Sequence, residues 1–545
     1  MEYLVEHNKT KCHESFGRYV AFTYQDVLAV PTTGKPEYNV FDEKRCIWRE
    51  FNKVKMEAMV TSAFKHVRGM DSSTLQGDFE EREAISAHTG LEALEDHALK
   101  QNAIAECRQF VCRDLPPLDN AEGTLLFKCG NCLDFESNTV FRPTSASRYN
   151  RHCCVEYKAF DLPAELKGDW LKIVDDLALH WKDHDHIEAT GEDVWQLGRP
   201  DLRARLDEVL ASERFPFLSA IYNLYQDWDR ALYIIKWMCR IVAGVRCFNE
   251  ALFLWGLGLS GKDTIVNCLT GLLGYDTEDG YVGQLNPSYF AVAKGKDNGE
   301  GATAFLSSLQ YARLAVISER KKADTFDGDK LKPLTEQEGA RIPARKLFGN
   351  PSAFSMTAAI VALSNHQLDL GPDPDDGRLR RIVVDKMPLK FVPVESIKAD
   401  SPATWQPQDA SIKRRARDGV FCPEMVYVLQ SMFKTLLVRG GSNITPVPRD
   451  VEQEGLDVCA PVAGLSKTEA VTKWLRECCE PVRSQDATSQ PNVHDAMDTA
   501  GMSFSKAERP SVLLEVGLVK KSDGRGLNFY SWNFAGSLQA VGVKA

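Results

Sequence analysis

The chain has 545 residues, of which 43% are hydrophobic and 26% charged, a globular composition with room for about three or four domains. Its net charge of -10 argues against indiscriminate coating of nucleic acid, although a local basic channel is compatible with that total. No apolar run is long enough to span a bilayer, and the first residues lack a signal-peptide core. We therefore expect an intracellular protein without a membrane partner.

Residues 1–120 are predicted to form an N-terminal region of strands followed by helices. Within it, residues 16–51 alternate aromatic and polar positions, which predicts a β-hairpin around the turn Asp42-Glu43-Lys44. Residues 52–115 are charged and rich in Glu, Ala and Leu, with apolar residues at the spacing of one helix face.

Residues 123–157 contain a group of soft metal ligands, which are Cys129, Cys132, His152, Cys153 and Cys154. They are numerous enough for a tetrahedral zinc site. The alternative is that residues 125–128 and 139–141 are strands joined by turns, with the thiols packed as small hydrophobic side chains. We favour the strands, because the second ligand pair lacks the usual two-residue gap.

Residues 165–250 are predicted to be helical and, with the preceding strands, to form a second region over 121–250. They hold a further cluster, which consists of His180, Asp183, His184, Asp185 and His186. Metal binding is one interpretation of this cluster, but a solvated acidic helix end is the commoner one. The strongly apolar helix 231–245 leads into the next strand.

Residues 251–274 predict a buried strand, a glycine-rich loop and a helix with one apolar face. The loop from Gly256 to Lys262 fits the pattern G-x-x-x-x-G-K, in which backbone N–H groups surround phosphate oxygens and the lysine neutralises the outer phosphates. The next position of the pattern takes a Ser or Thr that holds Mg²⁺. Here it is Asp263, with Thr264 behind it.

Two later apolar strands are predicted to end in polar side chains. The first ends at Glu319, and an acid at that place lies beside Mg²⁺ and can polarise the attacking water. The second ends at Asn365, whose amide can sense the γ-phosphate or hold the water. Strands in this order predict an α/β fold with a parallel-sheet ATPase core over 251–395.

Arg380 and Arg381 precede a further hydrophobic strand. They are either solvated charge or an arginine finger, which stabilises phosphoryl-transfer charge from a neighbouring subunit. Residues 396–460 are proline-punctuated and predict a lid helix and a linker. Residues 461–545 predict a small domain of helices and a basic-tipped hairpin, resembling a winged helix.

The segments GLGLSGKDT, ARLAVISER, AAIVALSNH and DDGRLRRIVV, in this order, resemble the superfamily 3 helicases, in the branch of the poxvirus-type and phage-satellite primase-helicases. The resemblance covers roughly residues 16–440 and includes that branch's helicase-preceding domain and helical collar. It implies an AAA+-like motor with ATP and Mg²⁺, which is expected to assemble as a homo-oligomer, a hexamer, and to translocate 3′-to-5′ on single-stranded or forked DNA. The place of action would be the nucleus, the cytoplasm or a viral replication site. The primase domain of the branch is expected to be absent, leaving a stand-alone helicase or a piece of a longer chain, and the resemblance suggests a separate primase or polymerase as a partner.

Carried over by position, the resemblance assigns the site residues. The phosphate loop is Gly256, Gly258, Ser260, Gly261, Lys262, Asp263 and Thr264. The Mg²⁺ ligands are Asp263, Thr264 and Glu319. The catalytic set is Lys262, Glu319, Asn365 and Arg380 or Arg381. The basic residues of a pore segment that grips DNA are Lys330, Lys332, Arg341, Arg345 and Lys346, for which a solvated surface loop is the alternative.

Asp263 leaves a second function open. Its carboxylate could ligate Mg²⁺ directly, but it also adds negative charge near the phosphates. The alternative to a helicase is therefore a nucleotide-binding, hydrolysis-poor assembly or origin-binding replication factor. A weaker third hypothesis is a zinc-bearing DNA-binding regulator built on residues 129–154 and the winged helix.

Overall fold

The computed structural model describes most of the predicted elements. The described residues are 20–21, 24, 28–29, 38–51, 53–68, 97–111, 122–147, 149–188, 200–245, 249–256, 258–275, 279–291, 304–318, 326–336, 341–345, 351–366, 368, 381–398, 401–437, 447–448, 451, 467–482, 487, 489–499, 509–522, 528–534 and 537–543. They belong to two compact units, residues 1–157 and 158–545. Across these ranges every helix is too short or too polar to cross a bilayer. The finer five-region organisation stays a prediction.

The first unit begins with antiparallel strands and helices. Its first elements are β1 (Leu28–Ala29), β2 (Tyr38–Asp42), β3 (Ile47–Phe51), α3 (Lys53–Arg68) and α6 (His97–Val111). The predicted hairpin is confirmed as β2 and β3, which pair antiparallel. Its turn is fixed by Asp42, whose Oδ1 accepts hydrogen bonds from the backbone N–H groups of Lys44 and Arg45.

The cysteine-rich stretch of this unit folds as a small sheet. Its strands are β4 (Thr124–Leu126), β5 (Cys132–Asp134) and β6 (Thr139–Phe141), in the order β4-β5-β6. The predicted strands are thus confirmed, and β5 between them was missed. Cys132 lies in a hydrophobic cluster with Ile47 and Trp48, and its Sγ lies 3.3 Å from the Tyr149 hydroxyl. Within the described ranges no group of three or more His, Cys, Asp and Glu side chains is placed to hold a metal.

Helices form one layer of the second unit. They are α7 (Ala164–Glu188), α8 (Pro200–Ala211), α9 (Pro216–Tyr225), α10 (Trp228–Ala243) and α16 (Cys422–Leu437). The predicted apolar helix is confirmed as α10, whose residues are all buried. α7 and α16 are joined by the Trp170 indole, which donates to Ser431 Oγ at 2.6 Å. The cluster at 180–186 lies at the end of α7, and the side chains of Asp183, His184, Asp185 and His186 are outside the described part.

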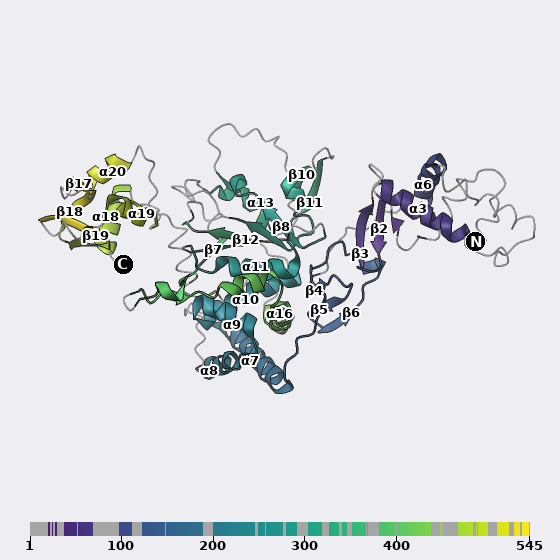
Figure 1. The fold of residues 1–545 in the computed structure, drawn as a ribbon, viewed down its shortest axis with the longest axis horizontal. Helices are drawn as coiled ribbons and strands as arrows, with labels where there is room; N and C mark the ends of the chain where they lie inside the picture. Colours follow the sequence, from purple (N-terminus) through teal and green to yellow (C-terminus); the bar gives the residue numbers. More distant parts are fainter. Residues whose placement is uncertain are drawn as a thin grey trace, which may run out of the picture. The chain divides into compact units, whose positions relative to one another are not determined.

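A five-stranded parallel sheet lies beside this layer and confirms the α/β class (Figure 1). Its strands are β7 (Ala251–Trp255), β8 (Val282–Leu285), β9 (Leu314–Ile317), β12 (Ala359–Ser364) and β13 (Ile382–Lys386), in the order β13-β7-β12-β9-β8. All of its strand pairs are parallel. The carboxyl ends therefore share one edge, and β7 lies between β13 and β12 with Trp255 opposite Ser364.

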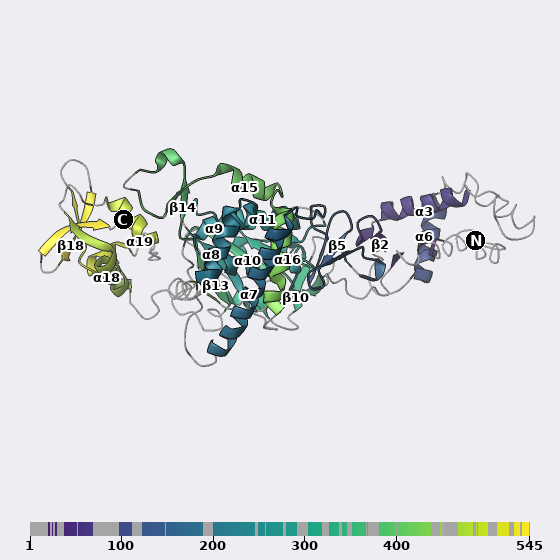
Figure 2. The same ribbon diagram turned by 90° about the horizontal axis from the view of Figure 1, so that it is seen from below.

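The two faces of the sheet are covered differently. In Figure 1, α10, α16 and α11 (Lys262–Leu273) lie below the sheet, and Figure 2, seen from below, shows them in front of it. In Figure 1, α13 (Lys332–Thr335) and the antiparallel pair β10 (Arg341–Arg345) and β11 (Pro351–Ser355) lie above the sheet. Three further short elements are α12 (Ala304–Ser307), η3 (Pro287–Phe290) and η4 (Gly328–Lys330). Leu306 of α12 and Phe290 of η3 share one hydrophobic core with Ile342 of β10. Phe253 of β7 packs into that upper core against Phe326.

The segment after β13 returns to α11. It contains β14 (Lys390–Val392), η5 (Val394–Ser396), β15 (Trp405–Pro407) and α15 (Ala410–Arg417). α15 lies directly on α11, because a Cβ placed on Gly271 would be 2.3 Å from the Ala416 carbonyl oxygen. Only glycine permits this backbone approach.

The C-terminal elements form a small α+β assembly with its own core. They are α18 (Lys467–Cys478), β16 (Cys479–Val482), α19 (Gln490–Thr499), α20 (Arg509–Glu515), β17 (Val519–Ser522), β18 (Asn528–Phe534) and β19 (Ser537–Val543). The predicted hairpin is confirmed as β17 and β18, while β19 and β16 extend the sheet in the order β16-β19-β18-β17. Its likeness to a winged helix stays a prediction.

Candidate functional site

The glycine-rich loop runs from the carboxyl end of β7 to the first turn of α11. Gly261 has φ +89°, a conformation that an L side chain adopts only with strain. A Cβ there would also lie 2.4 Å from Leu224 Cδ2 of α9. The carbonyl of Leu259 accepts a hydrogen bond from Phe391 N at 2.8 Å, which ties the loop to β14. The loop is thus fixed by α9 on one side and by β14 on the other.

Lys262 turns its ammonium group back over the loop. Nζ donates to the Gly256 carbonyl at 2.6 Å, to Ser260 Oγ at 3.2 Å and to Asn365 Oδ1 at 2.7 Å. The side chain is only 5% exposed. A buried cation held by neutral oxygens is ready to exchange them for an anion, because charge-assisted hydrogen bonds are the stronger ones.

Asn365 reaches the loop because its strand is the neighbour of β7. It directly follows β12, so its amide stands at the carboxyl edge of the sheet, where ligands of parallel sheets bind. β9 follows next in the sheet and ends at Ile317, but Glu319 lies outside the described residues. The structure therefore joins the predicted lysine and the predicted sensor amide, which are 103 residues apart in sequence.

A pocket of about 590 Å³ opens over this loop. Its walls include the predicted Gly258, Ser260, Gly261, Lys262, Asp263, Thr264 and Asn365, together with Ala220, Asn223, Leu224, Gln226, Leu259, Phe391, Gln406, Pro407, Gln408, Asp409, Ala410, Ile412 and Lys413. Apart from Leu259 of the loop itself, the second group comes from α9 and the residue after it and from the segment from β14 to α15. The sequence did not predict this wall, since α9 was expected only as part of the helical region 165–250, and β15 and α15 only as part of a lid helix and linker.

Asp263 and Thr264 face different surroundings in the first turn of α11. Thr264 is 7% exposed, whereas the Asp263 side chain is 54% exposed. The Asp263 carboxylate accepts a hydrogen bond from Lys413 Nζ of α15 at 2.5 Å. Asp263 therefore has a cationic partner that its place in the loop pattern did not predict.

The pocket wall formed by α9 depends on a carboxyl group that is distant in the sequence. The N-cap of α9, Phe215, has no capping side chain, and Glu424 of α16 supplies the missing acceptors. Its two carboxyl oxygens accept from Phe217 N at 2.7 Å and from Leu218 N at 3.0 Å. Burial raises the pKa of Glu424 to about 8, and the two backbone hydrogen bonds oppose that rise.

This raised pKa gives stability a definite pH dependence. The pKa of Glu424 is higher in the folded chain than its ordinary value of 4.5. Between pH 4.5 and about pH 8 the folded state therefore binds one proton more than the unfolded state. The stabilisation is complete below pH 4.5 and is lost as the pH rises towards 8, at up to about 1.4 kcal/mol per pH unit. We expect the free energy of unfolding of wild type, minus that of Glu424→Gln, to fall across this window.

The measurement is chemical unfolding at pH 5, 6, 7 and 8. Glu395→Gln, at an exposed position, is the matched control. A difference between wild type and Glu424→Gln that stays constant over this range would contradict the raised pKa.

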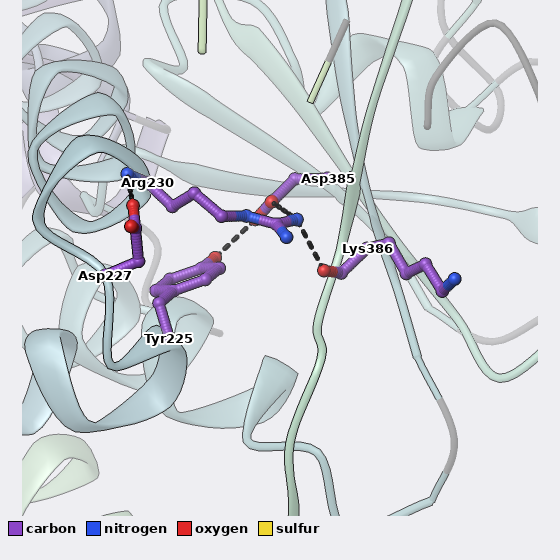
Figure 3. Close-up of polar contacts among 5 residues, drawn as sticks. All are labelled: Tyr225, Asp227, Arg230, Asp385 and Lys386. Atoms are coloured by element: carbon purple, nitrogen blue, oxygen red, sulfur yellow. Dashed lines mark hydrogen bonds and ion pairs between the residues drawn. The ribbon is translucent and has the colours of Figure 1, made fainter. Parts of the chain in front are cut away.

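The corner between α9 and α10 is tied to the sheet by a buried polar cluster. Figure 3 shows the side chains of Tyr225 and Arg230 meeting the carboxylate of Asp385, which lies in β13 and is 0% exposed. Tyr225 donates through its hydroxyl, and Arg230 Nη2 donates to Asp385 Oδ1 at 2.9 Å and to the Lys386 carbonyl at 2.6 Å. Burial beside Asp385 raises the pKa of Tyr225 well above its usual value, so the hydroxyl keeps its proton.

The arginine pair divides between described and undescribed residues. Arg380 lies outside the described part, whereas Arg381 directly precedes β13 and is 9% exposed. Its carbonyl accepts from Ala251 N at 2.8 Å, so it stands at the amino edge of the sheet. That edge is about 16 Å from the loop at about 3.3 Å per residue. Because Arg381 is buried in its own chain, it is a poor candidate for an arginine finger that contacts another subunit.

The described residues of the predicted basic pore segment lie in three elements, η4, α13 and β10. Lys330 and Lys332 form ion pairs with Asp327 at 3.6 Å and Asp329 at 2.9 Å, so their charge is locally balanced. Arg341 begins β10 and donates to the Ala353 carbonyl at 3.0 Å. The side chain of Arg345 and the whole of Lys346 lie outside the described residues.

Comparisons with known proteins leave the family undetermined. No protein-family model matches the chain, and no curated protein matches it in sequence. An apo structure of the NrS-1 C-terminal region (305–718) is similar at a TM-score of 0.31 and 11% identity, over 61% of this chain and 76% of that chain. The A form of that region gives a TM-score of 0.29 and 10% identity over the same shares. Likenesses this weak carry no argument, so function has to be inferred from the residues of this chain.

Proposed function

We propose that the second unit binds and hydrolyses ATP and that the chain is a ring-forming, hexameric DNA helicase of the superfamily 3 type, serving a replication system. The observation that carries the proposal is the buried Lys262 ammonium, which joins the glycine-rich loop to Asn365 at the carboxyl edge of the sheet. This places a cation, loop amides and a polar strand end around one pocket, which is the arrangement that phosphoryl transfer needs.

The pocket has the size and the polarity for a nucleotide. A volume of about 590 Å³ lies within the usual range of small-molecule sites. Lys262 and the loop amides would bind the phosphates. Pro407 and Ile412 are apolar residues of the lining that could contact a base, and Gln226 and Gln408 offer amides that could hydrogen-bond its edge.

Mg²⁺ fits the donors at the loop. It is usually held by one or two protein oxygens together with substrate phosphates and waters. The Asp263 carboxylate and the Thr264 hydroxyl are adjacent in the first turn of α11 and both line the pocket. When bound, the ion would neutralise charge that develops on the phosphate oxygens.

In the proposed mechanism each of four predicted catalytic residues has its own role. Lys262 exchanges its loop and amide acceptors for phosphate oxygens and neutralises the transferred group. Asn365, released from the lysine, orients the attacking water or reports the γ-phosphate. Glu319 takes the proton of that water, and Arg380 of an adjacent copy stabilises the transition-state charge.

The DNA-binding part of the proposal depends on Arg341 and Arg345, which begin and end β10, and on Lys346, which follows them in the sequence. Cations at a strand pair can follow a phosphate backbone without reading sequence. Lys330 and Lys332 carry less of this role, since each has an acidic partner nearby.

The proposal is tested by hydrolysis of Mg-ATP by the purified chain with and without single-stranded DNA, and by unwinding of a forked duplex. We expect DNA to stimulate hydrolysis and unwinding to need ATP. Tight nucleotide binding without hydrolysis would favour the second candidate, an assembly or origin-binding factor, for which the specific observation is the Asp263 carboxylate in the lining of the pocket. Wild-type protein that neither binds nor hydrolyses nucleotide would overturn both.

A further inference from the structure

The ion pair between Asp263 and Lys413 stands at the mouth of the pocket. The two residues are 150 positions apart in sequence, yet Lys413 Nζ lies 2.5 Å from Asp263 Oδ2. Both side chains line the pocket, and they are 63% and 54% exposed for Lys413 and Asp263. The pair is thus open to solvent and to a ligand, and exposed pairs of this kind hold together only weakly.

The backbone around Lys413 is fixed by contacts other than this pair. α15 lies against α11 at Gly271, where the Ala416 carbonyl leaves no room for a side chain. The N-terminus of α15 is capped by Asp409, whose Oδ1 accepts from Ser411 N at 2.8 Å. Gln408 N donates to the Val392 carbonyl at 2.8 Å, which ties the entry of α15 to β14. Lys413 is therefore held over the loop even when its ammonium group turns away from Asp263.

The ammonium group of Lys413 can either compensate the charge of Asp263 or bind a phosphate. A carboxylate at position 263 would repel the phosphates that the loop binds, and the ammonium of Lys413 cancels that charge. Phosphates carry several negative charges and accept charge-assisted hydrogen bonds from lysine. They can therefore compete with one exposed carboxylate for Lys413.

We infer that Lys413 is a second phosphate-binding cation, which Asp263 holds at the pocket mouth and which exchanges that carboxylate for the outer phosphates when a nucleotide binds. The exchange leaves the carboxylate of Asp263 available to Mg²⁺. This inference rests on the proposed nucleotide binding and adds a device to it, since occupancy of the pocket changes the contact between α11 and α15.

The test measures the affinity of a fluorescent ATP analogue in EDTA and in Mg²⁺, for wild type, Lys413→Met, Asp263→Asn and the double variant. In EDTA, Lys413→Met should bind about tenfold more weakly, because it loses a cation and leaves the carboxylate uncompensated. Asp263→Asn should bind more tightly than wild type, and the double variant should lie between the two single variants. In Mg²⁺, Asp263→Asn should gain less from the ion than wild type does.

Control variants distinguish a failure of this inference from a failure of the proposed nucleotide binding. Lys413→Arg should keep most of the affinity, and Lys434→Met, which removes another exposed lysine with an acidic partner, should leave it unchanged. Thermal melting of each variant checks folding. If Lys262→Met weakens binding while Lys413→Met binds like wild type, the inference fails and the nucleotide site stands. If wild type binds no nucleotide, both fail.

Discussion

Lys262→Met is expected to weaken nucleotide binding about 10- to 100-fold and to lower the hydrolysis rate by a further factor of about 100 to 1,000. The variant keeps the aliphatic stem but loses the ammonium, which donates to Gly256, Ser260 and Asn365. Affinity falls because a charge-assisted contact to phosphate is worth more than a neutral one. The rate falls more, because the same ammonium faces charge that grows in the transition state.

Binding of the fluorescent analogue and steady-state hydrolysis measure the two effects separately. Lys434→Met is the matched control, since Lys434 pairs with Asp175 and is not among the residues that line the pocket. Melting temperatures identify variants that fail through unfolding. If a correctly folded Lys262→Met chain hydrolysed ATP at the wild-type rate, the loop would not be the phosphate site.

The parts of this site that the sequence predicted are those encoded in one stretch. The loop from Gly256 to Lys262 follows an apolar strand, and Asn365 ends another, so a run of buried residues followed by a polar end was enough to find each. The parallel sheet followed from the same pattern. These predictions needed only local order along the chain.

The parts that were missed depend on contacts between distant positions. Lys413 meets Asp263 across 150 positions, and Glu424 caps α9 across 206. Neither lysine nor glutamate is unusual in a charged helix, so only the fold reveals these partners. One local hint of the missing cap is present in the sequence, since neither the N-cap Phe215 nor Pro216, the first residue of α9, carries a side-chain oxygen that could accept a hydrogen bond.

Asp385 shows a second reason why the sequence does not predict a contact. It occupies a strand, β13, that the sequence predicted, but a lone acid in a hydrophobic strand reads equally well as a position exposed at an edge. The structure buries it completely and satisfies it from the α9–α10 corner, through Tyr225 and Arg230. A buried acid in a strand therefore needs a donor from another element, which the sequence does not identify.

Asp385→Ala is accordingly expected to destabilise the second unit by about 3–5 kcal/mol, because it leaves the buried guanidinium of Arg230 without its carboxylate. Tyr225→Phe should cost less, about 1–2 kcal/mol, since it removes one hydrogen bond and no charge. The measurement is guanidinium unfolding followed by tryptophan fluorescence. Asp418→Ala, which breaks the exposed pair with Arg417, is the matched control and should stay within about 0.5 kcal/mol of wild type.

The same substitution should also reach the pocket. Leu224 and Gln226 flank Tyr225 in the chain and line the pocket, and Leu224 packs within reach of Gly261. Loosening Tyr225 and Arg230 from β13 therefore frees the wall that fixes the loop, so Asp385→Ala should bind nucleotide more weakly even where it remains folded. A variant that loses stability yet keeps wild-type affinity would show that the cluster joins the helical layer to the sheet without positioning the loop.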